Sequence, residues 1–470
     1  MRPGPTIIPT TRYNVDGRRA RASSLSRRWS PRRSAVLART ADGADGVLHQ
    51  SPRQGHAGNP GTRLRRVAVG GSRPWGHGAL SNSAFGSEQA LDVVVVGSGP
   101  AGSTCALQLA RSGLSVAILD KSAPPRHKTC GGGVVGRARK LVGFDIAPVV
   151  EYECRSAEMR LLHERLCFRV EREEPLVSMT MRTELDGHML DEALGAGARL
   201  IAPCELRGLD TGRSDLSIAT SRGPLRARYV VAADGASSRT ARAAGWPENQ
   251  NNIPAVESEL RVDPAAFERL RSTARFDFGL PRNGYAWVFP KRQHLSVGCL
   301  TTRRGSRGLR QCLDRYLELL GVDRVEARTD HGSLIPVAPR AAVLARDRVL
   351  LTGDAAGLAD PVTCEGITHA IASGRLAGQA IATAPGSPSA VYAAYHRALS
   401  RNILSELRIA RVLTRVLYDH LNLRLALFRR VGRPFCEAFT EIICGRQSYR
   451  SLFLRPSNYF RLLAAYARGS

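Results

Sequence analysis

Three glycines at a fixed spacing mark the segment of this chain with the clearest chemistry. Gly97, Gly99 and Gly102 follow an apolar run and precede a stretch with helical periodicity. In a G-x-G-x-x-G pattern the first glycine permits a tight turn, the second lets the backbone approach a pyrophosphate, and the third allows close packing of helix on strand. The helix would direct its free N–H groups and its positive dipole end at the phosphates. This pattern predicts a dinucleotide site.

An acidic residue completes the pattern. Asp120 ends a second apolar run that begins at Val116, 18 residues after the last of the three glycines. A carboxylate at this point accepts hydrogen bonds from ribose hydroxyls and disfavours a 2′-phosphate. A glycine motif between strand and helix, followed by such an acid, is far more specific than the motif alone. The candidate dinucleotide-binding residues are Gly97, Gly99, Pro100, Ala101, Gly102, Asp120 and Lys121.

Two later motifs indicate which dinucleotide binds. Asp234 and the pair Gly353-Asp354 each follow a short apolar run. Alone, each would indicate only a turn. In this order the three motifs resemble the flavoprotein hydroxylase superfamily, which implies FAD, with Asp354 binding its ribityl hydroxyls. The resemblance also implies a helix that starts near Gly366-Ile367 and points its N-terminus at the flavin, where its dipole stabilises the negative charge of the reduced ring.

Two segments narrow this resemblance to one family. Lys128–Gly133 reads K-T-C-G-G-G, and Gly284–Lys291 reads G-Y-A-W-V-F-P-K. With the flavin motifs they resemble the geranylgeranyl reductase family, over roughly residues 91–383. The family implies an FAD enzyme that saturates prenyl double bonds in lipids, quinones or chlorophyll precursors. The chain departs from the family pattern at Cys299-Leu300 and at Cys364, where glycine is usual.

The chemistry of such a reduction explains these residue types. An isolated alkene is a poor hydride acceptor, so a proton must be supplied, and Cys130 or Tyr285 is the candidate donor. Tyr285, Trp287 and Phe289 alternate along a predicted strand, so their rings share one face, which could bury a prenyl chain and stabilise cationic charge. We predict Cys130, Tyr285 and Trp287 as catalytic, and Tyr285, Trp287 and Phe289 as substrate-binding. The alternatives are a plain core stripe and a structural cysteine.

Three further residues are candidates for contact with the flavin. Cys130 and Gly131 belong to a triple-glycine turn, whose backbone could approach the cofactor closely. Arg182 opens an R-x-x-x-D element that resembles one of the family, which implies contact with FAD; a surface arginine is the alternative. Cys130 and Cys364 could form a redox-sensitive pair. None of the ten cysteines is spaced C-x-x-C, so no metal site is predicted.

The motifs and periodicities predict an α/β fold. It comprises a Rossmann-like FAD-binding domain interleaved with an antiparallel-sheet substrate domain, plus a helical C-terminal region. We assign residues 88–150, 178–247 and 345–395 to the FAD-binding domain, 151–177 and 248–344 to the substrate domain, and 396–470 to the helical region.

A basic helical stretch is expected within the C-terminal region, over residues 401–430. Arg408, Arg411 and Arg415 share one side of it. The opposite side is expected to carry Val412, Leu413, Val416 and Leu417. This stretch could lie on an anionic membrane, or it could pack on the flavin domain.

Charge is strongly skewed along the chain. The net charge is +27, and residues 1–87 carry fifteen arginines, three aspartates and no lysine. With no sustained apolar period, these residues are expected to be a disordered extension. We favour translation from a mis-set upstream start codon over an organellar transit peptide. The remainder shows no recognisable nucleic-acid-binding motif, so no nucleic-acid partner is expected.

The sequence as a whole favours an FAD-dependent prenyl reductase. The expected partner is an isoprenoid small molecule or lipid, and the electron donor is NADPH or ferredoxin. No run of 18 apolar residues occurs, so we expect a cytoplasmic protein, a monomer, with peripheral contact at the inner face of the membrane as an option. The alternative on the same fold is an FAD-dependent monooxygenase or halogenase acting on an aromatic or polyketide substrate.

Overall fold

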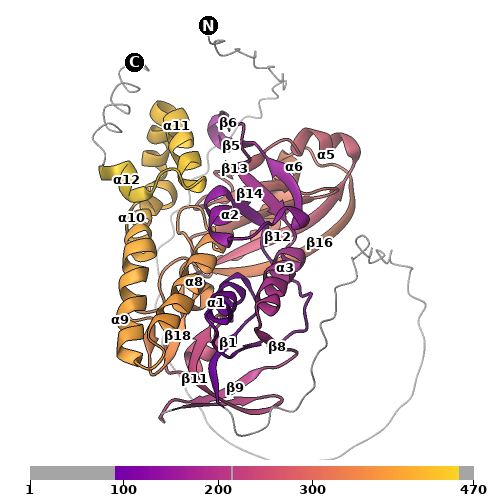
Figure 1. The fold of residues 1–470 in the computed structure, drawn as a ribbon. Helices are drawn as coiled ribbons and strands as arrows, with labels where there is room; N and C mark the ends of the chain where they lie inside the picture. Colours follow the sequence, from indigo (N-terminus) through magenta and orange to yellow (C-terminus); the bar gives the residue numbers. More distant parts are fainter. Residues whose placement is uncertain (1–89, 213–214, 455–470) are drawn as a thin grey trace, which may run out of the picture. The chain divides into compact units, whose positions relative to one another are not determined.

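A computed structural model describes residues 90–212 and 215–454 of the chain (Figure 1). The predicted extension at residues 1–87 and the end of the predicted helical region lie outside the described residues. The described residues form three sheets and a set of helices that follow the α/β class expected from the sequence.

The central sheet carries the predicted β-α-β unit. Its order is β17-β18-β11-β1-β2-β8, and every pair from β18 to β8 is parallel. β1 is buried on both faces, which explains its continuous run of valines. The strands are β1 (Leu91–Val96), β2 (Val116–Leu119), β8 (Arg199–Ile201), β11 (Gly223–Ala232), β17 (Ala345–Arg346) and β18 (Val349–Leu351). β10 (Leu216–Thr220) pairs antiparallel with β11, and β9 (Leu206–Asp210) pairs antiparallel with β10.

Helices cover this sheet and bring the glycine turn beside the later flavin motifs. α1 (Pro100–Arg111) packs against both α3 (Arg182–Gly195) and α8 (Ile367–Thr383). The contact with α8 is so close that a Cβ added to Gly374 would lie 2.1 Å from the Ala101 carbonyl oxygen. The other helices of this layer are α4 (Arg239–Ala243), α7 (Gly353–Ala356) and α9 (Pro388–Leu399).

The second sheet has the order β16-β12-β15-β14-β13-β5-β6 and confirms the expected antiparallel sheet, except that β13 and β5 are parallel. Its strands are β5 (Ser156–Leu161), β6 (Leu166–Glu171), β12 (Asn252–Val262), β13 (Ala274–Phe278), β14 (Gly284–Pro290), β15 (Leu295–Thr301) and β16 (Val325–Pro336). A third sheet joins β3 (Gly133–Val135), β7 (Val177–Thr180) and β4 (Val150–Cys154).

The two faces of β14 bury different side chains. Tyr285 and Trp287 belong to a core shared with the C-terminal helices. Ala286 and Val288 pack on the opposite face in a separate core, which includes residues of α5 (Pro264–Leu270) and α6 (Leu309–Leu319). This alternation is the strand period that the sequence predicted.

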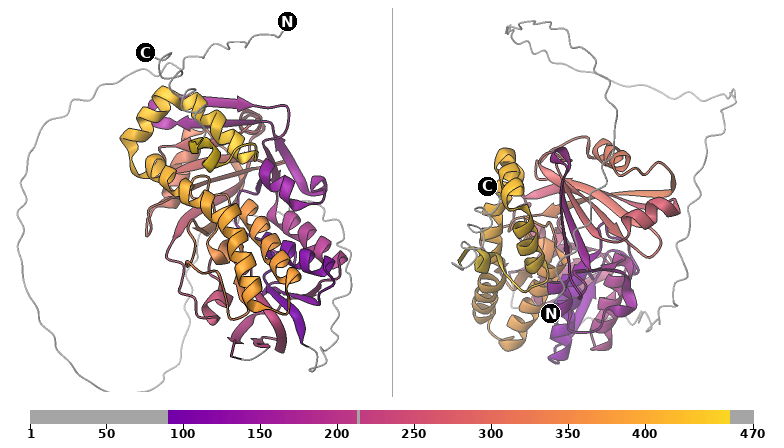
Figure 2. Two further views of the ribbon diagram at one scale, coloured as in Figure 1. Left: turned by 60° about the vertical axis from the view of Figure 1, so that its left-hand side comes forward. Right: turned by 90° about the horizontal axis from the view of Figure 1, so that it is seen from above.

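The C-terminal helices run from the central sheet, where α9 packs, to the seven-stranded sheet, where α11 packs (Figures 1 and 2). They include α10 (Ser405–Thr414), α11 (Leu421–Ile443) and α12 (Tyr449–Leu454). The remaining helical segments are α2 (Gly136–Val142), the 3-10 turns Ala147–Val149 and Leu162–Glu164, and the π-helical segments Ser400–Leu404 and Arg415–Asp419. In the part of the chain that is described, no helix is both long enough and apolar enough to cross a membrane.

Two details of the predicted basic stretch were wrong. Residues 401–430 are not one helix, because His420 has non-helical torsions (φ −106°, ψ 82°) and separates the π-helical segment from α11. Val412, expected on the packed side, is 61 % exposed and lies with the exposed arginines. Leu413 and Leu417 are buried as expected.

Candidate active site

One cavity of about 1060 Å³ gathers most of the predicted site residues. Its walls come from the ends of the central strands, the segment before β3, the faces of β12 and β14, the start of α8, and α11. The predicted residues that line it are Gly97, Gly99, Pro100, Ala101, Asp120, Lys121, Cys130, Gly131, Arg182, Asp234, Tyr285, Trp287, Phe289, Asp354, Gly366 and Ile367. Gly102 and Gly353 lie behind the wall and serve packing.

The glycine turn has the conformation that its sequence requires. Gly97 has φ +106°, and a Cβ there would lie 2.4 Å from the Ala233 carbonyl oxygen. A Cβ on Gly102 would lie 1.8 Å from the Gly97 carbonyl oxygen, so this residue allows helix and strand to meet. No side chain caps the N-terminus of α1, which leaves backbone donors facing the cavity.

Asp120 stands at the end of β2 with its carboxylate held in place. It accepts hydrogen bonds from the Ser98 amide (2.9 Å), the Ser122 amide (3.0 Å) and Arg126 Nε (3.0 Å). Burial alone would raise the pKa of Asp120, but the positive charge of Arg126 and these hydrogen bonds outweigh it and lower the pKa. The carboxylate is therefore ionised at neutral pH, as an acceptor for ribose hydroxyls must be.

A chain of charges crosses the glycine turn, and the sequence had not predicted it. Arg126 also pairs with Asp186 (3.4 Å), which in turn holds Arg182 through two hydrogen bonds of 2.7 and 2.9 Å. Arg182 is 9 % exposed, so the alternative of a surface arginine was wrong. A Cβ on Gly99 would lie 3.3 Å from Arg126 Nη2, which puts this cation beside the turn expected to receive the pyrophosphate. No motif marks Arg126 in the sequence.

The Gly353-Asp354 motif packs directly on α1. Gly353 has φ +51°, donates its amide to Ser373 Oγ at 2.9 Å, and would bring a Cβ to 3.0 Å from the Ala101 Cβ. Asp354 therefore faces the cavity beside the start of α8, where a Cβ on Gly366 would lie 3.4 Å from its carboxylate. Gly366 offers no side-chain cap, but Glu365 Oε1 accepts the Thr368 amide at 2.6 Å, so the first turn of α8 is partly capped beside the cavity.

Asp234 lines the cavity but also organises its own turn. Its carboxylate accepts hydrogen bonds from the amide (3.0 Å) and hydroxyl (2.9 Å) of Thr240 and from the hydroxyl of Ser238. These bonds fix the start of α4, so the motif has a structural use beside the predicted one.

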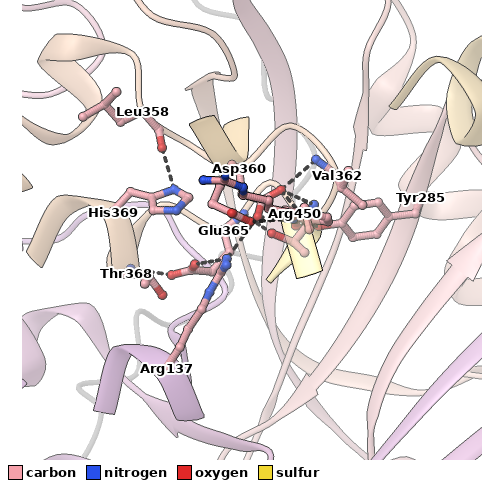
Figure 3. Close-up of polar contacts among 12 residues, drawn as sticks. Arg137, Tyr285, Leu358, Asp360, Val362, Glu365, Thr368, His369 and Arg450 are labelled. Atoms are coloured by element: carbon pink, nitrogen blue, oxygen red, sulfur yellow. Dashed lines mark hydrogen bonds and ion pairs between the residues drawn. The ribbon is translucent and has the colours of Figure 1, made fainter. Parts of the chain in front are cut away.

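The loop before α8 is held by side chains from α2 and α12, and Figure 3 shows the Arg137 side chain pointing at Asp360 and Glu365. Asp360 is fully buried; its carboxylate accepts hydrogen bonds from Arg137 Nη2 and from the Tyr449 hydroxyl, all at 3.1 Å. Arg137 also reaches Glu365 at 3.1 Å. Cys364, between these acids, has φ +57°, which is uncommon for a residue with a side chain. The loop that lines the cavity is thus tied to α2 and to α12.

A buried lysine fixes the K-T-C-G-G-G turn. Lys291, only 1 % exposed, donates to the carbonyl oxygens of Gly131 (2.7 Å) and Thr180 (2.9 Å). Gly132 has φ +66°, and a Cβ there would lie 2.0 Å from the Thr180 carbonyl oxygen. The two family segments of the sequence therefore meet in space, and Cys130 is half-buried at the cavity wall.

Aromatic rings form the apolar part of the cavity. The ring of Trp287 lies 6.2 Å from those of both Tyr285 and Phe289, and Phe276 lies 5.4 Å from Phe289. Phe439 and Ile443 of α11 complete this part of the wall. The sequence did not predict these α11 residues or Phe276, because nothing local links them to β14.

Two hydrogen-bond donors in this wall, the Tyr285 hydroxyl and the Trp287 indole N–H, differ in whether they have a partner. The Tyr285 hydroxyl donates to the Thr363 carbonyl oxygen at 2.5 Å, and burial, followed by the nearby Cys364, raises the pKa of Tyr285 well above its ordinary value. Trp287 is 6 % exposed, yet its indole Nε1 has no hydrogen-bond partner among the described residues. A buried donor without a partner at a cavity wall is expected to meet a ligand.

Cys130 and Cys364 both line the cavity, and both are unpaired thiols. Burial raises the pKa of the Cys364 thiol. The redox-sensitive pair stays a prediction.

These features fit a bound FAD. The glycine turns keep the cradle free of side chains, and Asp120 and Asp354 offer acceptors for its ribose and ribityl hydroxyls. The uncapped start of α1 faces its phosphates, and the orphan donor of Trp287 faces the cavity. This is the fold and site of an FAD-dependent oxidoreductase.

Comparison with known proteins agrees with that class. The model for the family described as FAD binding domain matches residues 90–398. Digeranylgeranylglycerophospholipid reductase 2 of Methanothermobacter thermautotrophicus is 32 % identical over 62 % of this chain and 78 % of its own length. The chain belongs to the geranylgeranyl reductase family of FAD-binding proteins.

Solved structures share the fold. A geranylgeranyl bacteriochlorophyll reductase-like protein from Thermoplasma acidophilum superposes with a TM-score of 0.63 at 22 % identity, over 81 % of this chain and 98 % of that one. The flavin-dependent brominase Bmp2 has a TM-score of 0.61 at 18 % identity, over 81 % of this chain and all of that one. The fold is therefore common to reductases and halogenases.

Proposed function

We propose that this enzyme saturates carbon–carbon double bonds of an isoprenoid chain by hydride transfer from reduced FAD. One observation carries the proposal: the glycine cradle and the wall of Tyr285, Trp287 and Phe289 line one continuous cavity. A prenyl chain is apolar and unsaturated, which suits a wall of rings more than the polar groups expected around a hydroxylated aromatic substrate. The related reductase of an isoprenoid lipid supports the same substrate class.

Bound FAD would supply the hydride, and the residues of the chain would supply the rest. The aromatic faces would stabilise positive charge that develops on the alkene, by about 1–2 kcal/mol for each good contact. We assign the proton donation to Cys130, because the Tyr285 hydroxyl already donates to Thr363. Tyr285 would then hold the Thr363–Cys364 loop against the cavity.

The direct test is anaerobic incubation of the purified, photoreduced protein with prenyl diphosphates, prenyl quinones and archaeal-type lipids. We expect one class to gain pairs of hydrogen atoms by mass, and Cys130→Ala to lose at least about 10²-fold in rate, as for removal of a positioned proton donor. Cys105→Ala, which changes a buried thiol away from the cavity, is the control. Product that forms only with molecular oxygen or halide would instead indicate a monooxygenase or halogenase.

We further propose NADPH or ferredoxin as the electron donor. Anaerobic mixing of the oxidised protein with each donor should bleach the flavin absorbance with one of them. Bleaching by neither would contradict both assignments.

We also propose peripheral contact with anionic membranes through α10 and the segment that follows it. Arg408, Arg411, Arg415 and Val412 are exposed on this surface, and basic side chains around an apolar one favour anionic bilayers. Wild-type protein should sediment with anionic but not neutral vesicles, and the triple change Arg408→Glu, Arg411→Glu and Arg415→Glu should abolish this. The same change at Arg303, Arg304 and Arg307 is the matched control. Failure of the wild type to sediment would overturn the proposal.

A further inference from the structure

A buried carboxyl group stands at the cavity wall without a cation to pair with. Glu257 of β12 is 2 % exposed and forms no ion pair among those found in the described residues. Its Oε1 accepts the Ser296 hydroxyl at 2.5 Å, and the backbone of Cys130 hydrogen-bonds to its carboxylate. Glu257 is therefore in direct contact with the segment that carries the candidate proton donor.

The sheet register explains how Glu257 reaches the cavity. Trp287 of β14 lies opposite Gly298 of β15, Gly298 opposite Glu257, and Glu257 opposite His331 of β16. Directly opposed residues project from the same face of a sheet. Since Gly298 has no side chain, the Trp287 indole occupies its place, and a Cβ there would lie 2.2 Å from the ring.

His331 of β16 lies directly opposite Glu257 in the sheet register, so both side chains project from the same face of the sheet. His331 is half-buried and stacks on the exposed His127, with ring centroids 3.9 Å apart. A path from solvent to the Glu257 carboxyl is thus lined by groups that can carry a proton.

A second branch approaches Glu257 along the same strand. Ser296, which donates to Glu257, lies opposite Glu259 in the sheet register. Glu259 pairs with His294 at 2.7 Å, and both side chains are about one-sixth exposed, at 17 % and 16 %. This branch connects Glu257 to the surface through a hydroxyl and an ion pair.

Burial, together with a neighbouring acid, brings the pKa of Glu257 close to neutrality. Burial, and then the charge of Glu259, raise the pKa of Glu257 to about 7, against the hydrogen bonds of Ser296 and Cys130 and the charge of Lys291. The titratable and charged groups that face it are Glu259 of β12, Lys291 and His294 between β14 and β15, His331 of β16, and Cys130 at the same cavity.

We propose that Glu257 is the proton carrier that reprotonates the Cys130 thiolate between turnovers. The inference rests on the proposed reduction, which consumes one hydride and one proton for each double bond. The Cys130 S–H bond breaks as the new C–H bond forms, and the hydride with its electron pair comes from the reduced cofactor. The Glu257 O–H proton then passes to the thiolate, and solvent restores it through His331 or through Glu259. The protein returns to its starting state.

A test without turnover uses the oxidised holoenzyme. The rate of Cys130 alkylation by iodoacetamide is measured against pH and read by mass on the tryptic peptide Thr129–Arg137, which holds no other cysteine. Ionisation of the adjacent carboxyl changes this rate, so the wild type should show an inflection near pH 7, and Glu257→Gln should lack it. The matched control is Glu158→Gln, a buried carboxylate of the same sheet that is not a cavity residue. Identical profiles in all three proteins would overturn the proposal.

A turnover test separates this role from a structural one. Cys130 holds one proton, so reduced Glu257→Gln should complete a first turnover at the wild-type rate and then slow by about 10²-fold, the scale of a lost proton transfer. Glu158→Gln should show no such burst. Sustained turnover of Glu257→Gln at the wild-type rate would refute the role of Glu257 as the proton carrier. Absence of alkene reduction in the wild type would refute the proposed function and leave the alkylation result standing.

Folding of the variants is checked by their flavin content. If Glu257→Gln retains no flavin, Glu257→Asp is measured in its place, since it keeps a carboxyl but withdraws it from Cys130. If Glu257 is the proton carrier, the inflection in the pH profile of Cys130 alkylation should move in this variant, and its second turnover should be slower. An unchanged alkylation profile would contradict this role.

Discussion

Single residues of this protein carry two kinds of constraint, steric at the glycines and electrostatic at the buried acids. At Gly97 the constraint is doubled, because both its φ of +106° and the Ala233 carbonyl oxygen exclude a side chain. Gly113 shares a positive φ (+78°), but no atom of another residue lies within 4 Å of the position that a Cβ would take there. Substitutions at Gly97 and Gly113 therefore distinguish the effect of backbone strain alone from the effect of a side chain that blocks the FAD-binding turn.

Gly97→Ala should cost more than about 2 kcal/mol of unfolding free energy and abolish FAD binding, since strain and overlap both act there. Gly113→Ala should cost about 1 kcal/mol, from its backbone conformation alone, and keep the cofactor. Urea unfolding and the flavin absorbance of the purified proteins measure both. Stoichiometric FAD in Gly97→Ala would show that the cradle is not where the sequence motif indicates.

The buried acid Glu257 makes stability depend on pH with a definite sign. Its pKa is about 7 in the folded chain against 4.5 when unfolded, so the folded state binds more protons between these values. Its contribution is fully present below pH 4.5 and is lost as pH rises through 7. The loss amounts to about 3 kcal/mol, at about 1.4 kcal/mol per pKa unit.

Replacing this acid should remove that dependence. As pH rises from about 4 to about 8, the unfolding free energy of Glu257→Gln should increase by about 3 kcal/mol relative to that of the wild type. Urea unfolding of both proteins across this range measures the difference. Parallel stability curves would show that Glu257 titrates at its ordinary pKa.

At the scale of elements, the C-terminal helices form part of the site instead of a free appendage. α12 contributes Tyr449, whose hydroxyl bonds both oxygens of the Asp360 carboxylate. α11 contributes Phe439 and Ile443 to the cavity wall. The cofactor loop and the apolar wall therefore depend on helices that follow the FAD-binding segments in sequence.

Tyr449→Phe should destabilise the protein by about 2 kcal/mol, because it removes hydrogen bonds to a buried charged group. It should also speed FAD release, since the Asp360–Glu365 loop lines the cavity. Tyr229→Phe, which removes a hydroxyl bond to the Pro385 carbonyl oxygen far from that loop, should cost about 1 kcal/mol and leave FAD release unchanged. Equal release rates in the two variants would contradict this role for α12.

The elements also show what sequence reasoning can and cannot reach. The β-α-β unit, the positive φ of Gly97 and the aromatic face of β14 were predictable because each depends on neighbours within a few residues. Arg126, Phe276 and Glu257 were missed because their roles arise from contacts between segments distant in sequence. The break at His420 and the exposure of Val412 were missed for another reason: periodicity assumes one regular helix.

At the scale of the whole molecule, the cavity joins both large sheets and the C-terminal helices, so cofactor binding should stabilise them together. With FAD at about 100 times its dissociation constant, unfolding should cost about 2.7 kcal/mol more than in the apoprotein. Intrinsic tryptophan fluorescence and far-ultraviolet circular dichroism should report one shared transition. Separate transitions, with only one moved by FAD, would show that the sheets unfold independently.

The tie between Asp360 and Tyr449 has a consequence for biosynthesis. A ribosome delivers the glycine cradle early and the helix that shields the Asp360 carboxylate near the end of translation, while folding proceeds from the N-terminus. A nascent chain that is halted before α12 would lack Tyr449. The buried Asp360 carboxylate would then keep Arg137 but lose its second side-chain partner. Tight retention of the yellow cofactor would then mark a polypeptide whose synthesis had run past Tyr449, so colour would distinguish it during purification from products that stop before α12.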